Sequence, residues 1–163
     1  MNILVLGIGQ SLRGDDASGL DAVELWQQIH PRTASLVRVE LSEFPGMEFL
    51  NLLDGMDAAV IVDAVQGNGS VGTVIRIRME ELASFKTETG STHGWGVVET
   101  LQLGISINPG LANNKITFIG IVGDNFEMGM GLSHAVQEAL PKAGQMIEKE
   151  ISEWMAMGKK VNG

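Results

Sequence analysis

Apolar and polar positions along the chain follow two periods, one typical of buried strands and one of amphipathic helices. Continuous apolar runs such as residues 2–8 and 58–65 predict strands that are buried on both faces. Residues 17–30 carry apolar side chains at helical spacing and are followed by Pro31, which predicts a helix that ends there. The full prediction is strands at 2–8, 35–41, 58–65, 72–79 and 115–123, and helices at 17–30, 46–55, 92–107 and 132–157, the last one kinked or restarted at Pro141.

This alternation of strands and helices indicates the fold class. Strands separated by helices pair in parallel through right-handed crossovers, so we expect an α/β fold, a three-layer α/β/α sandwich with a mostly parallel central sheet of about five strands. The most apolar strand, 58–65, is expected at the centre, and the alternating strand 72–79 near an edge. Residues 1–158 are expected to form a single domain, and residues 159–163 a loose C-terminal tail.

Composition and charge narrow the expected partners and location. The chain of 163 residues has 44% hydrophobic and 19% charged residues, as a globular domain has. Its net charge of −9 argues against a surface that neutralises nucleic-acid phosphates. No apolar run approaches the roughly 20 residues of a membrane span, and the first run is expected to be a strand rather than a signal peptide. There is no cysteine for a disulfide or a thiolate metal site. We therefore expect a cytoplasmic protein, monomeric when free, with no nucleic-acid or membrane partner.

Three residues that can bind a metal ion fall at or near the carboxyl ends of predicted strands. Asp16 follows the first strand by a short loop, Asp63 lies near the end of strand 58–65, and His93 stands at the start of the helix after the edge strand. Ligands bind at this edge of such sheets, so we expect the three side chains to converge there. Two carboxylates and an imidazole suit a divalent ion such as Zn²⁺ or Ni²⁺ and leave coordination positions open, as in a catalytic or recognition site.

Each of these residues also has a simpler interpretation. An aspartate at a helix start most often caps the helix, which is the first expectation for Asp15. Asp63 could cap a neighbouring loop, and His93 could belong only to the start of its helix. A dinucleotide site is another alternative because "GIGQSL" begins a G-x-G-x-x-G pattern. Against it, Leu12 replaces the third glycine, and two aspartates stand where a pyrophosphate would bind.

Four segments of the chain resemble the hydrogenase maturation endopeptidases. "ILVLGIGQSLRGDDASG" is similar to the opening of that family, "ILVLGIGN…L..DDG.G", and "VIVDAV" with the following "GTV" is similar to its central segment. "STHGWGVVETL" is similar to its histidine motif, and "IGIVGDNFEMGMGLSHAV" to its closing segment. The resemblance covers nearly the whole chain, and it implies the same α/β fold.

The resemblance also implies a function. Members of this family are endopeptidases that remove a C-terminal extension from the large-subunit precursor of nickel–iron hydrogenase after nickel has been inserted. The matching positions imply that Asp16, Asp63 and His93 are metal ligands that recognise the nickel borne by the precursor, and that Asp16 and Asp63 are catalytic. A zinc-like divalent ion is expected to be able to occupy the site in isolation.

One loop departs from the family. "LSEFPG" stands where many members have D-G-G-T-x-G, and only its last residue, Gly46, is kept. Because this loop is expected to rim the crevice, Glu43, Phe44, Pro45 and Gly46 are predicted to bind the substrate and to help select the precursor.

The sequence leaves the mechanism open. No serine nucleophile stands out, since "GQSLRG" is one residue too long for the G-x-S-x-G elbow. Either a metal polarises the scissile carbonyl while a carboxylate such as Asp15 or Glu43 acts as base, or nickel serves only for recognition. Two other kinds of protein remain as alternatives, a small nucleotide- or flavin-binding α/β module and a non-catalytic maturation factor that carries nickel.

Overall fold

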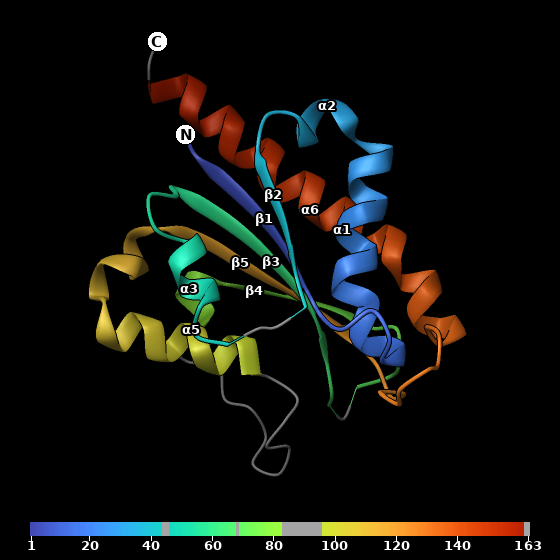
Figure 1. Ribbon diagram of the computed structural model, residues 1–163. Helices are drawn as coiled ribbons and strands as arrows, with labels where there is room; N and C mark the ends of the chain where they lie inside the picture. Colours follow the sequence, from blue (N-terminus) through green and yellow to red (C-terminus); the bar gives the residue numbers. More distant parts are fainter. Residues whose placement is uncertain (44–45, 68, 83–95, 162–163) are drawn as a thin grey trace.

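The computed structural model describes residues 1–43, 46–67, 69–82 and 96–161 (Figure 1). Its strands are β1 (Ile3–Ile8), β2 (Arg38–Ser42), β3 (Ala58–Val65), β4 (Val74–Arg78) and β5 (Lys115–Val122). Its α-helices are α1 (Ser18–Ile29), α2 (Pro31–Ala34), α3 (Phe49–Leu52), α4 (Met79–Leu82), α5 (Gly96–Ile107) and α6 (His134–Val161), and its 3₁₀ helices are η1 (Gly14–Ala17) and η2 (Pro109–Asn113). Each predicted strand is present, while η1, α2, α4 and η2 are short elements that the apolar pattern did not indicate.

The strands form one mixed sheet in the order β2-β1-β3-β5-β4. All pairs are parallel except β4 with β5. β4 runs against its neighbour because the chain turns back after β3 without a crossover helix. The predictions of a mostly parallel sheet, of β3 at its centre and of β4 at its edge are confirmed.

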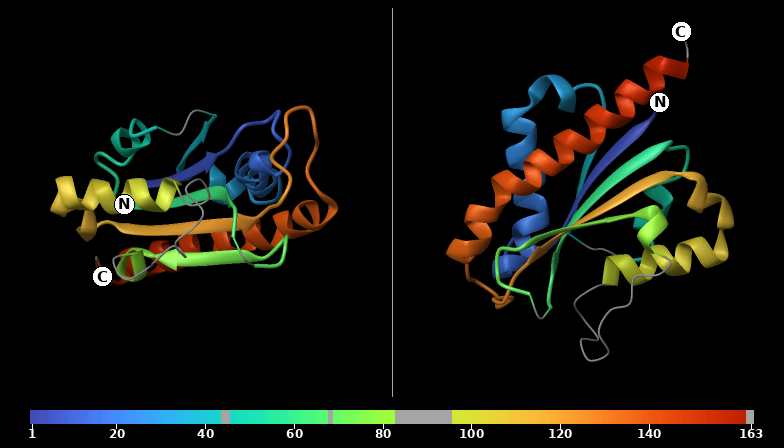
Figure 2. Two further views of the ribbon diagram at one scale, coloured as in Figure 1. Left: turned by 90° about the horizontal axis from the view of Figure 1, so that it is seen from below. Right: turned by 180° about the vertical axis from the view of Figure 1, so that it is seen from behind.

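Helices cover both faces of the sheet and complete the predicted three-layer sandwich. On one face α1 and α6 bury a core that includes Trp26, Val60 and Ile147. On the other face α3 and α5 cover a core that includes Phe118 and Leu101. Figure 2 shows α6 crossing its face of the sheet in the view from behind. Strand β3 supplies residues to both cores, which explains why its apolar run is almost unbroken.

Helix α6 differs from the prediction in two ways. It continues through Pro141 as a single helix of 28 residues, so the predicted restart does not occur. Pro141 is exposed and removes one intrahelical hydrogen bond, whereas buried residues such as Leu140 and Ala143 keep the helix packed on both sides of it. The helix also reaches Val161, three residues into the segment expected to be a loose tail. Even so, none of the helices described is long and apolar enough to span a membrane.

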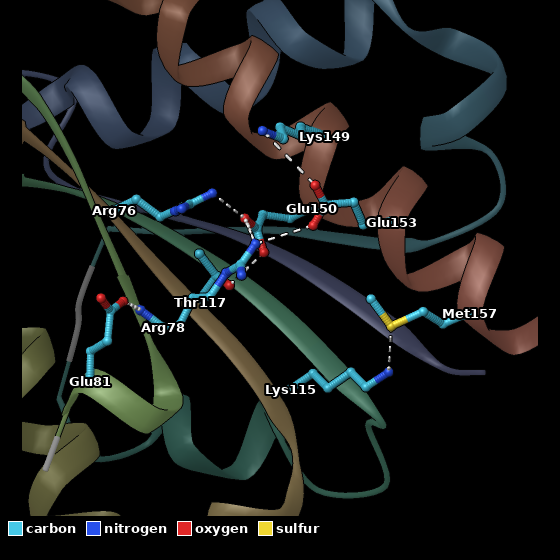
Figure 3. A network of polar contacts seen from close by, with 9 residues as sticks. All are labelled: Arg76, Arg78, Glu81, Lys115, Thr117, Lys149, Glu150, Glu153 and Met157. Carbon is cyan, nitrogen blue, oxygen red and sulfur yellow. Dashed lines mark hydrogen bonds and ion pairs between the residues drawn. The ribbon is translucent and has the colours of Figure 1, made fainter.

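A network around Glu150 ties α6 to the edge of the sheet (Figure 3). The Glu150 carboxylate is 1% exposed and pairs with the guanidinium groups of Arg76 and Arg78 at 3.1 Å each. It also accepts a hydrogen bond from the hydroxyl of Thr117 at 3.0 Å. Since Arg76 and Arg78 belong to β4 and Thr117 to β5, one buried carboxylate fixes the antiparallel edge strand against the helix layer.

Candidate active site

A pocket of about 380 Å³ opens beside the carboxyl ends of β1 and β3, the edge of the sheet at which the sequence predicts a site. Two of the residues predicted to form the site, Asp16 and Asp63, line this pocket. The lining residues described are Gly9, Gln10, Arg13, Asp16, Phe49, Asp63, Ala64, Gln66, Gly96, Val97, Thr100 and Phe126.

Close backbone packing brings the two carboxylates to one pocket. A side chain at Gly19, in the first turn of α1, would overlap the carbonyl oxygens of Ile8 and Val62. Only glycine lets α1 approach the ends of β1 and β3 this closely. Likewise, a side chain at Gly9 would overlap the carbonyl oxygen of Asp16, which accepts a hydrogen bond from the Gln10 N–H at 3.3 Å. The glycines of the opening motif therefore serve backbone packing around Asp16.

Asp16 lies in η1 and is half-buried. Desolvation raises the pKa of its carboxyl group, and the positive charge of Arg13 and the backbone N–H of Gln10 oppose that rise. Arg13 itself is exposed, and its Nε donates to the carbonyl oxygen of Phe126 at 3.3 Å. Asp16 thus has a cationic neighbour on the pocket wall.

Asp63 lies near the end of β3, where the other residues of the strand are buried and apolar. Its Oδ1 accepts a hydrogen bond from the N–H of Ala64 at 2.9 Å. Burial, and then the negative charge of Asp16, raise the pKa of the Asp63 carboxyl group well above its ordinary value. A positive charge that enters the pocket would stabilise the ionised form of this carboxyl group.

The third predicted ligand, His93, lies outside the described residues, so its role stays a prediction. Within the described part of the chain, no three acidic or histidine side chains gather closely enough to hold a metal ion. Gly96, Val97 and Thr100 of α5 line the pocket, however, and the segment that carries His93 directly precedes this helix.

Of the loop predicted to bind the substrate, Glu43 and Gly46 are described and Phe44 and Pro45 are not. Glu43 and Gly46 are exposed, and neither is among the residues that line the pocket. Glu43 accepts a hydrogen bond from the N–H of Ser11 at 3.2 Å, and hydrogen bonding from Ser11 lowers the pKa of its carboxyl group. Glu43 is therefore joined to the segment that also contributes Gln10 and Arg13 to the pocket.

The expectation that Asp15 caps a helix is wrong. Asp15 is inside η1 and fully buried, and its carboxylate accepts hydrogen bonds from three backbone N–H groups beyond β5. The donors are Asp124 and Asn125 at 3.1 Å each and Ser133 at 2.7 Å. Desolvation raises the pKa of this carboxyl group, but these hydrogen bonds together outweigh it and lower the pKa. Asp15 is thus a structural anion that holds the loop 123–133.

Sequence reasoning missed several pocket residues, of which Arg13 and Phe126 are the most informative. Phe126 comes from the loop after β5, more than a hundred residues from Asp16. Its position just beyond a predicted strand was a signal that could have placed it at the same edge of the sheet. Arg13 stands in the opening motif, but the local sequence pattern does not distinguish a residue that lines a pocket from one that contacts only solvent.

The structure matches solved proteases of one class. It resembles the hydrogenase maturating endopeptidase HybD of Escherichia coli with a TM-score of 0.72, at 28% identity over 94% of this chain and 93% of that one. It resembles the [NiFe] hydrogenase maturation protease HybD of Thermococcus kodakarensis with a TM-score of 0.70, at 28% identity over 93% of this chain and 99% of that one. The fold is that of the hydrogenase maturation endopeptidases, so the class of the protein is a peptidase.

The sequence comparisons identify the family. The chain is 29% identical over 154 residues to the hydrogenase 2 maturation protease of Escherichia coli K12, covering 94% of this chain and 92% of that protein. Residues 45–150 match the family model of HycI, hydrogenase maturation protease. The chain therefore belongs to the hydrogenase maturation protease family. Asp63 lies inside the matched range, and Asp16 precedes it.

Proposed function

We propose that this peptidase removes a C-terminal extension from the large-subunit precursor of a nickel–iron hydrogenase, and that cleavage requires nickel already seated in the precursor. The observation that carries the proposal is the pair of pocket carboxylates, Asp16 and Asp63, in a member of the hydrogenase maturation protease family. The comparisons give no support to the alternatives of a nucleotide- or flavin-binding module or a non-catalytic nickel carrier.

The need for nickel follows from charge. Asp63 is held in an apolar strand beside a like charge, and Arg13 offsets the charge of Asp16 only in part. A precursor that carries a divalent cation would bring the missing positive charge, whereas a nickel-free precursor would not. A carboxylate pair suits such an ion, and His93 is proposed as the third ligand. The bound ion would supply positive charge and open coordination positions next to the scissile bond.

Of the carboxylates considered as a base, Asp15 is excluded by geometry. Its carboxylate accepts three backbone hydrogen bonds from the loop after β5, and its side chain is fully buried. Glu43 lies outside the pocket lining. Asp16 and Asp63 are the carboxylates on the described pocket wall, so we assign the catalytic role to them.

The loop from Ser42 to Gly46 is proposed to help select the precursor. The hydrogen bond between Glu43 and Ser11 supports this role because it joins Glu43 to the segment that contributes Gln10 and Arg13 to the pocket. We also propose that the free protein is a monomer and acts in the cytoplasm, where a chain without cysteine needs no oxidising compartment.

The test compares nickel-loaded and nickel-free precursor in processing assays followed by mass spectrometry. Wild type should shorten only the nickel-loaded precursor. Asp16→Ala, Asp63→Asn and His93→Ala should lose most of the activity while staying folded, and the exposed control Asp54→Asn should keep it. Equal cutting of the nickel-free precursor, or full activity in all three folded site variants, would refute the proposal.

A further inference from the structure

Two loops beside the pocket expose large apolar side chains. Leu12 is 69% exposed, Met128 is 70% exposed and Met130 is 51% exposed. The loops lie side by side in Figures 1 and 2, where the segment after β1 meets the segment between β5 and α6. Backbone hydrogen bonds join them at these positions, from the Gly129 N–H to the Leu12 carbonyl at 2.8 Å and from the Gly14 N–H to the Met130 carbonyl at 3.0 Å. We call these three side chains the apolar rim.

The rim is held in a fixed shape rather than exposed by a loose loop. Asp15 binds both ends of the loop 123–133, through Asp124 and Asn125 at one end and Ser133 at the other. Its own N–H donates to the carbonyl oxygen of Asn125 at 2.6 Å. A buried, charged acceptor with three donors is a strong anchor. The chain thus uses a buried anion to hold water-exposed apolar side chains in place, which a surface without a partner does not require.

The rim is continuous with the candidate active site. The same two loops supply Gly9, Gln10 and Arg13 from one side of the pocket and Phe126 from the other. Phe126 and Met128 are two positions apart, and Arg13 Nε is bonded to the Phe126 carbonyl. A polypeptide that enters the pocket across these two loops would therefore pass next to the apolar rim.

We propose that the apolar rim binds an apolar segment of the precursor polypeptide next to the bond that is cleaved. The proposal rests on the endopeptidase function stated above, because a protease that cuts one bond in a protein needs contacts beyond that bond. Methionine side chains are flexible and polarisable, so they pack against side chains of different shape. In a chain with net charge −9, an uncharged patch beside two carboxylates also offers attraction that does not depend on the charge of the segment.

The test replaces apolar by polar side chains of similar size at the rim and at matched remote positions. The rim variants are Leu12→Gln and the double variant Met128→Gln with Met130→Gln. The controls are Leu36→Gln, whose side chain is also 69% exposed and lies in a turn, and Ile29→Gln, 57% exposed at the far end of α1. Binding of purified nickel-loaded large-subunit precursor is measured by biolayer interferometry, and processing by mass spectrometry.

The double rim variant should raise both the Kd and the KM for the precursor about tenfold, with kcat within about twofold, since loss of apolar contacts at binding hot spots has effects of this size. The controls should match wild type. Rim variants that bind the precursor as tightly as the controls would refute the proposal. It would also be refuted if the rim variants kept the wild-type affinity for the precursor but lost dimers that wild type forms in light scattering. The rim would then be an interface between two copies of the chain.

Failure of the proposed function gives a different result. Wild type would then bind the precursor without shortening it, and the affinities of rim and control variants would still decide whether the rim contacts that polypeptide. Absence of any binding by wild type would refute the rim as well.

Discussion

Replacement of Asp15 by asparagine should destabilise the protein far more than the near-identical shape of the two side chains suggests. The carboxylate accepts three backbone N–H groups, two at Oδ2 and one at Oδ1. An asparagine has only one acceptor oxygen, and its amide nitrogen donates. The better of its two orientations keeps the bonds from Asp124 and Asn125 and turns the amide group toward the N–H of Ser133.

The expected loss follows from this count. Hydrogen bonds to a charged group contribute about 1.5–3 kcal/mol each, so loss of the bond to Ser133 alone removes roughly that amount. The two remaining bonds become neutral and weaker. Together these changes should lower the free energy of unfolding by about 2–4 kcal/mol, which is a large part of the roughly 5–15 kcal/mol of a typical domain.

The pH dependence provides a second signature. Because the hydrogen bonds lower the pKa of Asp15 in the folded state, its stabilising contribution is fully present above the unfolded pKa of about 4 and is lost as the pH falls through the folded pKa. Asparagine does not titrate. The difference in stability between wild type and Asp15→Asn should therefore be largest near neutral pH and shrink below about pH 4.

Urea unfolding at a series of pH values measures both effects. The control is Asp54→Asn, at an exposed aspartate in the turn after α3, which should change stability by less than about 0.5 kcal/mol. A difference below about 0.5 kcal/mol for Asp15→Asn, or one that stays constant from neutral pH to pH 3, would show that Asp15 does not anchor the loop 123–133 as argued.

Three further predictions test the pocket carboxylate Asp63, the packing at Gly19 and the Glu150 network. Asp63→Asn should abolish processing and raise the free energy of unfolding at pH 7 by on the order of 1 kcal/mol. The stability rises because burial and the charge of Asp16 raise the pKa of Asp63 and disfavour its charged form, so the gain should vanish below about pH 4 in urea titrations. Gly19→Ala should lower stability by about 1–3 kcal/mol in thermal unfolding, since its methyl group overlaps the carbonyl oxygens of Ile8 and Val62; an unchanged melting temperature would contradict the close approach. Glu150→Gln should lower stability by about 2–4 kcal/mol, whereas Glu153→Gln, whose carboxylate is 37% exposed, should change it by less than about 1 kcal/mol; equal effects in denaturant unfolding would contradict the assigned roles.

The strands were predictable because their local patterns agree with their burial. Strand β3 was predicted at its observed bounds and at the centre of the sheet, since an unbroken apolar run is stable only when both faces are covered. Helix α6 was predicted to kink or restart at Pro141 because proline disfavours helix interiors in isolation. In the folded chain, buried side chains on both sides of Pro141 pack against the sheet and outweigh that preference.

The site was predictable only to the extent that topology determines it. Residues that follow parallel strands meet at one edge of the sheet, and this rule is enough to bring Asp16 and Asp63 to the same pocket. The rule gives no information on which neighbours complete the wall. Arg13 and Phe126 are 113 positions apart in the sequence and are joined by a hydrogen bond between two loops, which no local pattern indicates.

The two adjacent aspartates of the opening motif show this limit most clearly. Asp15 and Asp16 are neighbours in the sequence at the start of a predicted helix, where a cap is the ordinary expectation for an aspartate. In the fold, one carboxylate is fully buried against N–H groups that are 109 to 118 positions away, and the other faces the pocket. The division of roles is set by the loop after β5, because the donors that stabilise a buried anion come from there. A second carboxylate next to the one proposed as catalytic thus holds the wall of the pocket. Substitutions at Asp15 should therefore reduce processing through loss of stability and of loop geometry rather than through the chemistry itself.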